Sequence, residues 1–210
     1  DIIIKMINNG IPGIKIHEKQ TKSILLGAAK CGTTTLASWL GRHPDVYLIY
    51  NKESTFWSRD NYRGWEWYER QHLRNYFGEK YILDATAINL MLGFNSTRIS
   101  MSNDDIKYIV LIREPFARAY SHWSMMNSWR PGRVKSDFID AMIDCFRNYK
   151  IDPYPTEAEY VPYMEPKGEL YINPFIDGSM YANNILRYKD YKNFIVIPTS
   201  QIRNRFNDLL

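Results

Sequence analysis

Short apolar runs alternate with longer segments of helical spacing along this chain, and the alternation predicts an α/β domain with a parallel β-sheet. The apolar runs are continuous, which is typical of strands that are buried on both faces. Strands are expected at residues 23–27, 80–83, 107–112 and 193–197. Helices are expected at residues 33–40, from Pro115, at residues 136–149 and 179–188, and after Pro198.

The long segment at residues 150–176 breaks this pattern, since it holds five prolines and several tyrosines. We expect an extended surface loop there, because proline interrupts both helices and sheet ladders. The chain contains no internal repeat, low-complexity run or linker that would divide it. A single domain is therefore expected to hold all the predicted strands.

Composition and charge narrow the function classes. With 210 residues, of which 45% are hydrophobic and 15% aromatic, the chain is neither disordered nor a coiled coil. Its 27 Lys and Arg against 23 Asp and Glu give a formal net charge of +4, which suits an anionic ligand without requiring nucleic acid. The two cysteines are too few for a disulfide framework. No apolar stretch reaches the roughly 18–20 residues of a membrane-spanning helix.

The sharpest local motif lies between the first strand and the first helix, from Gly27 to Thr35, and we call it the phosphate loop. Glycines allow a tight turn, and successive N–H groups at the start of a helix point toward one spot. Such a spot binds phosphate or sulfate. Lys30 adds a mobile positive charge, and hydroxyl donors are added by Thr33, Thr34 and Thr35. The alternative is a threonine-rich first helical turn that binds no ligand.

The loop departs from the nucleotide triphosphatase pattern G-x-x-x-x-G-K-[ST] at one position. Thr33 follows the second glycine, where that pattern requires lysine. The strand at residues 107–112 also ends in Arg113 instead of a magnesium-binding aspartate. A nucleotide with a single 5′ phosphate-like group is therefore favoured over a triphosphate. A P-loop small-molecule kinase stays open as an alternative, and so does a nucleotide-binding module without catalysis.

A second anion site is predicted where the strand at residues 107–112 ends. Arg113 lies where ligands bind in open α/β sheets. Ser121 follows two helical turns later, so its hydroxyl can face the same way, and a guanidinium with a hydroxyl suits one phosphate group. The alternative for Arg113 is an ion pair with Glu114 or Asp84. Two anion sites on one sheet edge suit a donor with phosphates at its 5′ and 3′ positions.

Both motifs resemble those of the sulfotransferases that use 3′-phosphoadenosine 5′-phosphosulfate (PAPS) as donor. Residues 30–34 and 40–46 are similar to the 5′-phosphosulfate loop of the branch that includes heparan sulfate and bacterial carbohydrate sulfotransferases. Residues 113–121 match the 3′-phosphate motif R-[DE]-P-x-x-R-x-x-S of this family. The resemblance covers roughly residues 23–203, and it implies a P-loop-type three-layer fold with a central parallel sheet flanked by helices. It also implies in-line transfer of a sulfuryl group to a hydroxyl or amine without a metal ion.

The resemblance assigns roles to individual residues. Glu53 lies in a K-E-x-x-F-[FW] element, where the family's glutamate is the general base, and the alternative is a solvated surface glutamate. Lys30 is expected to neutralise charge on the leaving phosphate, whereas Arg118 and His43 are expected to support the structure. The implied donor ligands are Lys30, Cys31, Gly32, Thr33, Thr34, Thr35, Arg113, Ser121 and Tyr181, the last within a G-x-x-Y element.

Two departures from the family's pattern affect these expectations. Related enzymes carry E-K-[ST] after the second predicted strand, whereas this chain has Asp84, Ala85 and Thr86. The family also has a basic, glycine-containing loop that closes over the nucleotide, and the chain ends before it. Residues 1–22 are expected to be an N-terminal extension and residues 23–210 a sulfotransferase domain whose C-terminal part is missing. A bacterial protein of this kind is expected in the cytoplasm, and a eukaryotic one in the Golgi lumen.

Aromatic and basic residues gather after Glu53 and again after Ser121, which suits a glycan or another small-molecule acceptor. Aromatic faces stack on sugar rings, and arginines pair with carboxylates or sulfates. The residues are Trp57, Arg59, Tyr62, Arg63, Trp65, Trp67, Trp123, Trp129, Arg130, Arg133 and Lys135. The alternative places the tryptophans in the core, and a lipid, a polyketide intermediate or a protein tyrosine would also suit an aromatic cleft. Residues 95–97 form a glycosylation sequon, a motif that also occurs by chance.

Overall fold

The structure is a computed structural model that describes residues 21–92, 95–96, 99, 106–129, 131–132, 134–147, 175–191 and 193–206. Its centre is a five-stranded sheet in the order β2-β3-β1-β4-β5, in which every neighbouring pair is parallel. The strands are β1 (Thr21–Gly27), β2 (Val46–Leu48), β3 (Tyr81–Asp84), β4 (Lys107–Ile112) and β5 (Phe194–Pro198). Because all five run the same way, their carboxyl ends meet at one edge of the sheet.

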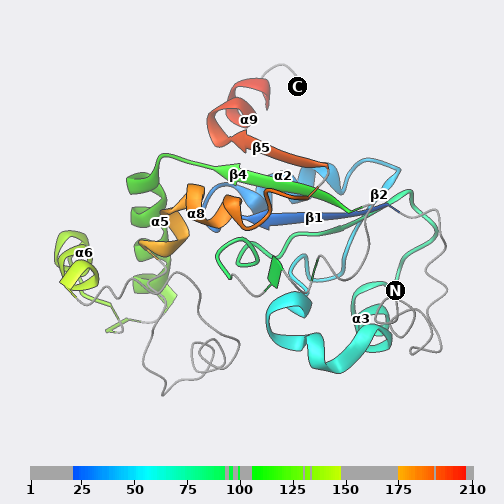
Figure 1. The fold of residues 1–210 in the computed structure, drawn as a ribbon, viewed down its shortest axis with the longest axis horizontal. Coiled ribbons are helices and arrows are strands. Elements are labelled where there is room, and N and C mark those ends of the chain that lie inside the picture. The colour runs from blue at the N-terminus through cyan, green and yellow to red at the C-terminus, as the bar shows by residue number, and fades with distance from the viewer. Residues whose placement is uncertain are drawn as a thin grey trace.

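Helices flank the sheet and extend beyond its carboxyl edge (Figure 1). The α-helices are α2 (Thr33–Leu40), α3 (Gly64–His72), α5 (Pro115–Trp129), α6 (Phe138–Arg147), α8 (Tyr181–Leu186) and α9 (Thr199–Phe206). Shorter turns are the π-helix η1 (Phe56–Asp60) and the 3-10 helices η2 (Asn61–Arg63) and η3 (Asp177–Ser179). Helix α2 contacts β1 and β2, whereas α5 lies beyond the carboxyl edge and contacts α6 and η3.

The predicted α/β fold with a parallel sheet flanked by helices is confirmed. All four predicted strands are present within two residues of their expected bounds, and α2 matches at both ends. Helices α6 and α8 are shorter than the predicted segments at residues 136–149 and 179–188, since α6 begins at Phe138 and Ser179 belongs to η3. The predicted extension at residues 1–22 and the predicted loop at residues 150–176 lie outside the described residues, except that residues 21–22 belong to β1 and residues 175–176 form the turn before η3.

Two elements are absent from the sequence prediction. Strand β2 has only three residues at the edge of the sheet, too few to show a period. Residues 56–72 form a π-helix, a 3-10 turn and α3 in succession, and this mixture carries no single helical spacing. Both elements are therefore positioned by tertiary packing rather than by local pattern.

The core surrounds the two central strands. Leu25 and Leu26 of β1 and Val110 and Leu111 of β4 are fully buried, which explains why these strands are apolar at successive positions. Burying one such side chain contributes about 1.5–3 kcal/mol. The central strands thus form a rigid platform whose carboxyl ends carry the phosphate loop and Arg113.

Aromatic side chains after Glu53 form a second part of the same core. Phe56 lies 4.8 Å from the ring of Trp65 and 5.0 Å from that of Tyr68, measured between centroids. Trp57 is 4% exposed and contacts Trp65 edge to face at 5.4 Å. The core interpretation is therefore confirmed for Trp57, and Trp65 and Trp67 pack against the same cluster. These rings fix the segment that carries Glu53.

The glycosylation sequon at residues 95–97 is buried where it is described. Asn95 is fully buried, and its Nδ2 donates to Oδ1 of Asn89 at 3.1 Å. The amide nitrogen that would carry a glycan is thus inaccessible and already bonded.

Within the described ranges, no helix combines the length and apolarity needed for a membrane span.

Candidate functional site

The phosphate loop connects the end of β1 to the start of α2. Gly27 has φ +149°, and a Cβ on it would lie 2.6 Å from the backbone oxygen of Ala87, so only glycine fits there. Gly32 has φ +89° and caps α2. The first intrahelical bond runs from the Leu36 N–H to the Gly32 carbonyl at 3.1 Å. The N–H groups of residues 33–35 precede that bond and have no acceptor within the helix, which makes this end attractive to an anion.

The predicted loop side chains are unequally exposed. Thr33 is buried, whereas Thr34 and Thr35 are exposed at the start of α2. Cys31 is fully buried, and burial raises the pKa of its thiol. A protonated, inaccessible thiol fits the expectation that Cys31 packs within the loop and performs no chemistry.

Lys30 leans toward α5. Its Nζ lies 3.4 Å from Sδ of Met125, and its own backbone is left-handed at φ +73°. Ser121 precedes Met125 by one helical turn, so both residues occupy the same face of α5. The structure therefore brings the face of α5 that carries Ser121 next to the phosphate loop, as the two-site prediction requires.

Arg113 follows β4 directly and touches the phosphate loop. Its Nη1 lies 3.5 Å from the Lys30 carbonyl oxygen, and its backbone N–H donates to the Tyr181 hydroxyl at 3.4 Å. That hydroxyl also lies 3.5 Å from Sγ of Cys31, and burial raises the pKa of Tyr181. Arg113, Tyr181 and the loop are thus neighbours at the carboxyl edge of the sheet.

The alternative ion pairs of Arg113 do not form. The Glu114 carboxylate accepts from the N–H groups of Phe116 at 2.8 Å and Ala117 at 2.6 Å, and these two bonds lower its pKa. Glu114 therefore caps α5. Among the described residues, the ion pairs within 4 Å do not include Arg113. Its guanidinium remains available to an anion.

Asp84 ends β3 and is buried among hydroxyl groups. Its carboxylate accepts from the Ser54 hydroxyl, from the Thr86 hydroxyl at 2.7 Å and from the Thr86 N–H at 3.1 Å. Burial raises the pKa of this carboxyl, and the hydrogen bonds partly oppose that rise. Asp84 therefore anchors the segment that carries Glu53 to the end of β3.

Glu53 lies over the end of β3, the strand next to β1 in the sheet. Its side chain is 43% exposed and pairs with Nζ of Lys52 at 2.6 Å. The same ammonium donates to the Ala85 carbonyl at 3.2 Å. A cation thus lies beside residue 85, where the resemblance leads one to expect a lysine side chain, although it comes from Lys52. The assignment of Glu53 as general base stays a prediction.

Arg118 is fully buried behind the phosphate loop, in agreement with the structural role expected for it. Its Nε donates to the Ser179 hydroxyl at 2.7 Å, and its Nη2 donates to the Phe175 carbonyl at 2.9 Å. A Cβ on Gly178 would lie 2.7 Å from Nη1 of Arg118. The glycine of the G-x-x-Y element is therefore needed to make room for this guanidinium.

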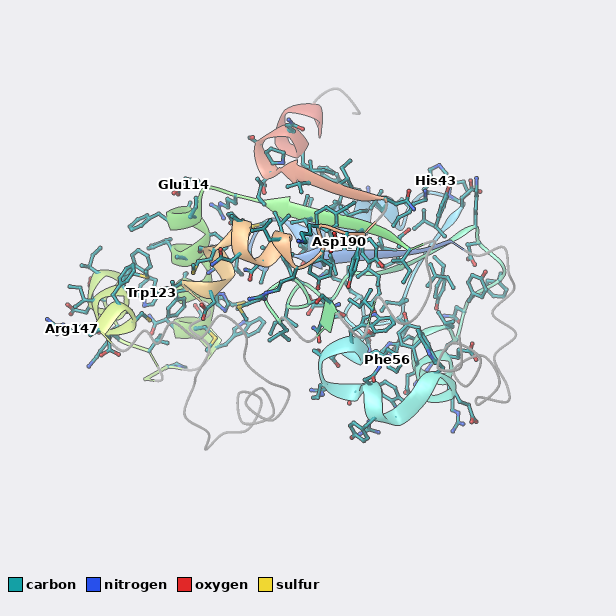
Figure 2. The ribbon with its side chains drawn as sticks, in the orientation of Figure 1. His43, Phe56, Glu114, Trp123, Arg147 and Asp190 are labelled. Carbon is teal, nitrogen blue, oxygen red and sulfur yellow. The ribbon has the colours of Figure 1, made fainter. Side chains whose placement is uncertain are left out.

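His43 lies at the opposite end of the molecule from the carboxyl edge, as Figure 2 shows through the labels on His43 and Glu114. Its Nδ1 accepts from the Asp45 N–H at 3.1 Å within an exposed turn. This position agrees with the structural role expected for His43 and is remote from Arg113.

The two predicted acceptor clusters do not form one surface. Trp123 lies on α5 and Phe56 on η1, and Figure 2 places their labels on separate sides of the molecule. Near Glu53, Arg59 and Arg63 both pair with the buried Asp60 carboxylate, at 2.9 and 3.2 Å.

The remaining members of these clusters differ in exposure. The Arg63 guanidinium lies 5.1 Å from the ring of Trp67 and 5.3 Å from that of Tyr62, between guanidinium carbon and centroid. Trp129 is 73% exposed at the end of α5. Trp123 donates from Nε1 to the Lys135 carbonyl at 2.9 Å. Arg130 and Arg133 lie outside the described residues.

Sequence reasoning missed one residue that touches the loop. Thr199 begins α9, and its hydroxyl lies 2.8 Å from the Cys31 carbonyl oxygen and 2.9 Å from that of Ile112. Its place directly after β5, at the same sheet edge as Arg113, is a signal that could have marked it.

In the described part of the chain, no group of three or more His, Cys, Asp or Glu side chains is arranged to hold a metal ion. The expectation of metal-free transfer stays a prediction.

Comparison with known proteins finds relatives of similar sequence among the sulfotransferases. The mouse heparan sulfate glucosamine 3-O-sulfotransferase 3B1 is 32% identical over 110 residues, which cover 52% of this chain and 28% of that protein. The human heparan sulfate glucosamine 3-O-sulfotransferase 6 is 29% identical over 128 residues, 59% of this chain and 37% of that protein. The chain thus spans about a third of the length of these relatives.

A solved structure and a family pattern cover more of the chain. The crystal structure of a sulfotransferase from Alicyclobacillus acidocaldarius matches with a TM-score of 0.70 and 22% identity, over 90% of this chain and 77% of that one. This likeness shows the fold. The pattern described as "Sulfotransferase domain" matches residues 20–177, which is most of the chain. The chain therefore belongs to the sulfotransferase domain family.

Proposed function

We propose that the protein transfers a sulfuryl group from PAPS to a carbohydrate hydroxyl or amine. One observation supports the proposal: Arg113 Nη1 lies 3.5 Å from the Lys30 carbonyl oxygen, so the residues of the two proposed anion sites are neighbours at one sheet edge. A donor with phosphates at both its 5′ and 3′ positions would use both sites. A triphosphate would not need the second, and Thr33 replaces the lysine that a triphosphate enzyme requires.

The donor is a co-substrate, and the residues of this chain have defined tasks toward it. The N–H groups at the start of α2 would bind its 5′ end, and Arg113 with Ser121 would bind its 3′ phosphate. As the acceptor oxygen or nitrogen bonds to sulfur, the bond between sulfur and the bridging phosphate oxygen breaks. That oxygen leaves with the electron pair, and the Lys30 ammonium neutralises its charge.

Glu53 is the proposed general base. Its half-exposed carboxylate can receive the proton that the acceptor loses as the new bond to sulfur forms. The Asp84 contacts and the aromatic cluster hold the segment in place. The Lys52 ammonium lies 2.6 Å from Oε1 of Glu53, and this ion pair fixes the direction of the carboxylate.

An anionic glycan is the proposed acceptor class. Two arginines flank the segment after Glu53, and Arg63 lies over the rings of Trp67 and Tyr62. Such a surface suits a sugar ring with a carboxylate or sulfate. The names of the mouse and human relatives, which act on heparan sulfate glucosamine, support the same class.

Transfer of labelled sulfate from PAPS to a panel of glycans tests the proposal on the full-length protein. Glu53→Gln should reduce turnover by about 100-fold or more while the affinity for adenosine 3′,5′-bisphosphate stays within twofold. Glu66→Gln is a matched control, because Glu66 is a well-exposed glutamate that pairs with Arg70 on α3. Unchanged turnover of Glu53→Gln would remove Glu53 as the base. Tighter binding of ATP with magnesium than of the bisphosphate would favour a kinase instead.

A further inference from the structure

We propose that Thr199 and Arg118 are positioning residues that hold the phosphate loop in its anion-binding shape through its backbone carbonyls. The inference rests on the proposed function, because it concerns the same donor site. Neither residue belongs to the loop: Thr199 begins α9 and Arg118 lies on α5.

Thr199 joins three segments through one side chain. Its hydroxyl lies 2.8 Å from the Cys31 carbonyl oxygen and 2.9 Å from the Ile112 carbonyl oxygen, so its single proton is shared between two acceptors. Its methyl carbon Cγ2 lies 3.6 Å from the place that a Cβ on Gly32 would occupy. The side chain thus fixes the loop against the end of β4.

Arg118 holds the other end of the loop. Its Nη1 donates to the Ala29 carbonyl at 3.3 Å. The guanidinium is fully buried and fixed by the Ser179 hydroxyl and the Phe175 carbonyl, at 2.7 and 2.9 Å. Since these contacts prevent the guanidinium from shifting, the Ala29 carbonyl is held in one direction.

Fixing these carbonyls also fixes the N–H groups that follow them. In a trans peptide the C=O and the next N–H point in opposite directions, so the contacts at Ala29 and Cys31 orient the N–H groups of Lys30 and Gly32. Arg113 Nη1 lies 3.5 Å from the carbonyl oxygen of Lys30, which is the carbonyl between those of Ala29 and Cys31. Three consecutive carbonyls are thus each approached by a side chain of another segment. Donors held in this way bind an anion without reorganising.

This arrangement predicts a larger effect at the 5′ end of the donor than at its 3′ end. The two side chains contact backbone carbonyls, which repel an anion, so they act through the loop rather than on the ligand. Removing either side chain's contacts should reduce the affinity for the 5′ phosphate more than the affinity for the 3′ phosphate, because most of these contacts lie on the loop. A residue with a general role in stability would affect both ends alike.

Calorimetric titration with two nucleotides measures this difference on the full-length protein. Thr199→Val keeps the shape of the side chain but removes the hydroxyl. Its affinity for adenosine 3′,5′-bisphosphate should fall about two- to tenfold, the loss expected for one hydrogen bond. Its affinity for adenosine 3′-phosphate, which lacks the 5′ group, should stay within twofold. Thr199→Ser retains the hydroxyl and should restore the bisphosphate affinity.

Two further variants complete the experiment. Arg118→Lys keeps the positive charge but loses the planar guanidinium with its several N–H donors. It should show the same selective loss of affinity for adenosine 3′,5′-bisphosphate. Ser128→Ala is the matched control, because Ser128 donates to the Ser124 carbonyl at 2.9 Å on an exposed face of α5, and neither affinity should change. Equal losses for both nucleotides in Thr199→Val, or a failure of Thr199→Ser to restore binding, would overturn the inference alone. A wild-type protein that binds neither nucleotide would overturn the proposed function as well.

Discussion

Acid should destabilise this protein through one buried histidine. His122 is 6% exposed on α5, and its Nδ1 lies 3.3 Å from Nη1 of Arg118. Burial first, and then the charges of Arg118 and Lys30, lower its pKa from 6.5 to about 3. Nδ1 therefore accepts a hydrogen bond from the guanidinium and stays unprotonated at neutral pH.

The size of the stability loss follows from the difference between the pKa of His122 in the folded chain and its pKa in the unfolded chain. The unfolded chain takes up a proton on this histidine near pH 6.5, whereas the folded chain does not until about pH 3. Stability is therefore fully present above pH 6.5 and is lost as pH falls, by about 1.4 kcal/mol per unit. Between pH 7 and pH 5 the loss from His122 is about 2 kcal/mol.

Urea denaturation at pH 7 and pH 5 measures this loss. His122→Asn is the informative variant, because its Oδ1 can accept from Arg118 in place of Nδ1 but does not titrate. The other titrating groups are common to both proteins, so they cancel when the two pH differences are subtracted. Wild type should lose about 2 kcal/mol more than the variant over this range. Equal losses in the two proteins would refute a buried, neutral His122.

Three further predictions concern individual contacts. Arg113→Ala should weaken binding of adenosine 3′,5′-bisphosphate about tenfold or more and weaken binding of adenosine 5′-phosphate far less in the same titration; equal losses would contradict the 3′ assignment. Gly178→Ala should lower the free energy of unfolding by about 1–3 kcal/mol, because its Cβ would lie 2.7 Å from the fixed Arg118 guanidinium; an unchanged urea midpoint would exclude this crowding. Asp84→Asn should lower the free energy of unfolding by about 1–3 kcal/mol, because an amide nitrogen replaces an oxygen that accepts from Ser54 or Thr86. Thermal melting measures this loss, and Asp140→Asn on α6 is the comparison variant.

The parts of the site that depend on local pattern could be predicted from sequence. Buried central strands need continuous apolar runs, so the ends of β1 and β4, and with them Gly27 and Arg113, could be placed. The glycine and threonine content of the loop also marked the start of α2 at Thr33. Strand ends and helix starts are set by residues that are neighbours in the chain, and they can therefore be predicted from the sequence.

Contacts between distant residues could not be predicted in the same way. Asp84 was considered as an ion-pair partner of Arg113, whereas its carboxylate accepts from Ser54 and Thr86, because the segment after β2 folds back over β3. The same folding buries Trp57 in the core. Nothing in a one-dimensional pattern distinguishes a tryptophan in a cleft from one in a core when the helical period is interrupted.

The bond between Thr199 and Cys31 spans 168 positions in the chain, and this distance has a consequence for biosynthesis. During translation the amino-terminal half can form β1 and α2 long before residue 199 leaves the ribosome. The phosphate loop would then lack its hydrogen bond from Thr199 until nearly the whole of the described chain has emerged, because the donor of that bond is synthesised last. The loop would therefore gain its full set of contacts only after synthesis has passed β5, and in a nascent chain cut before Phe194 the proposed donor should not stabilise β1 and α2.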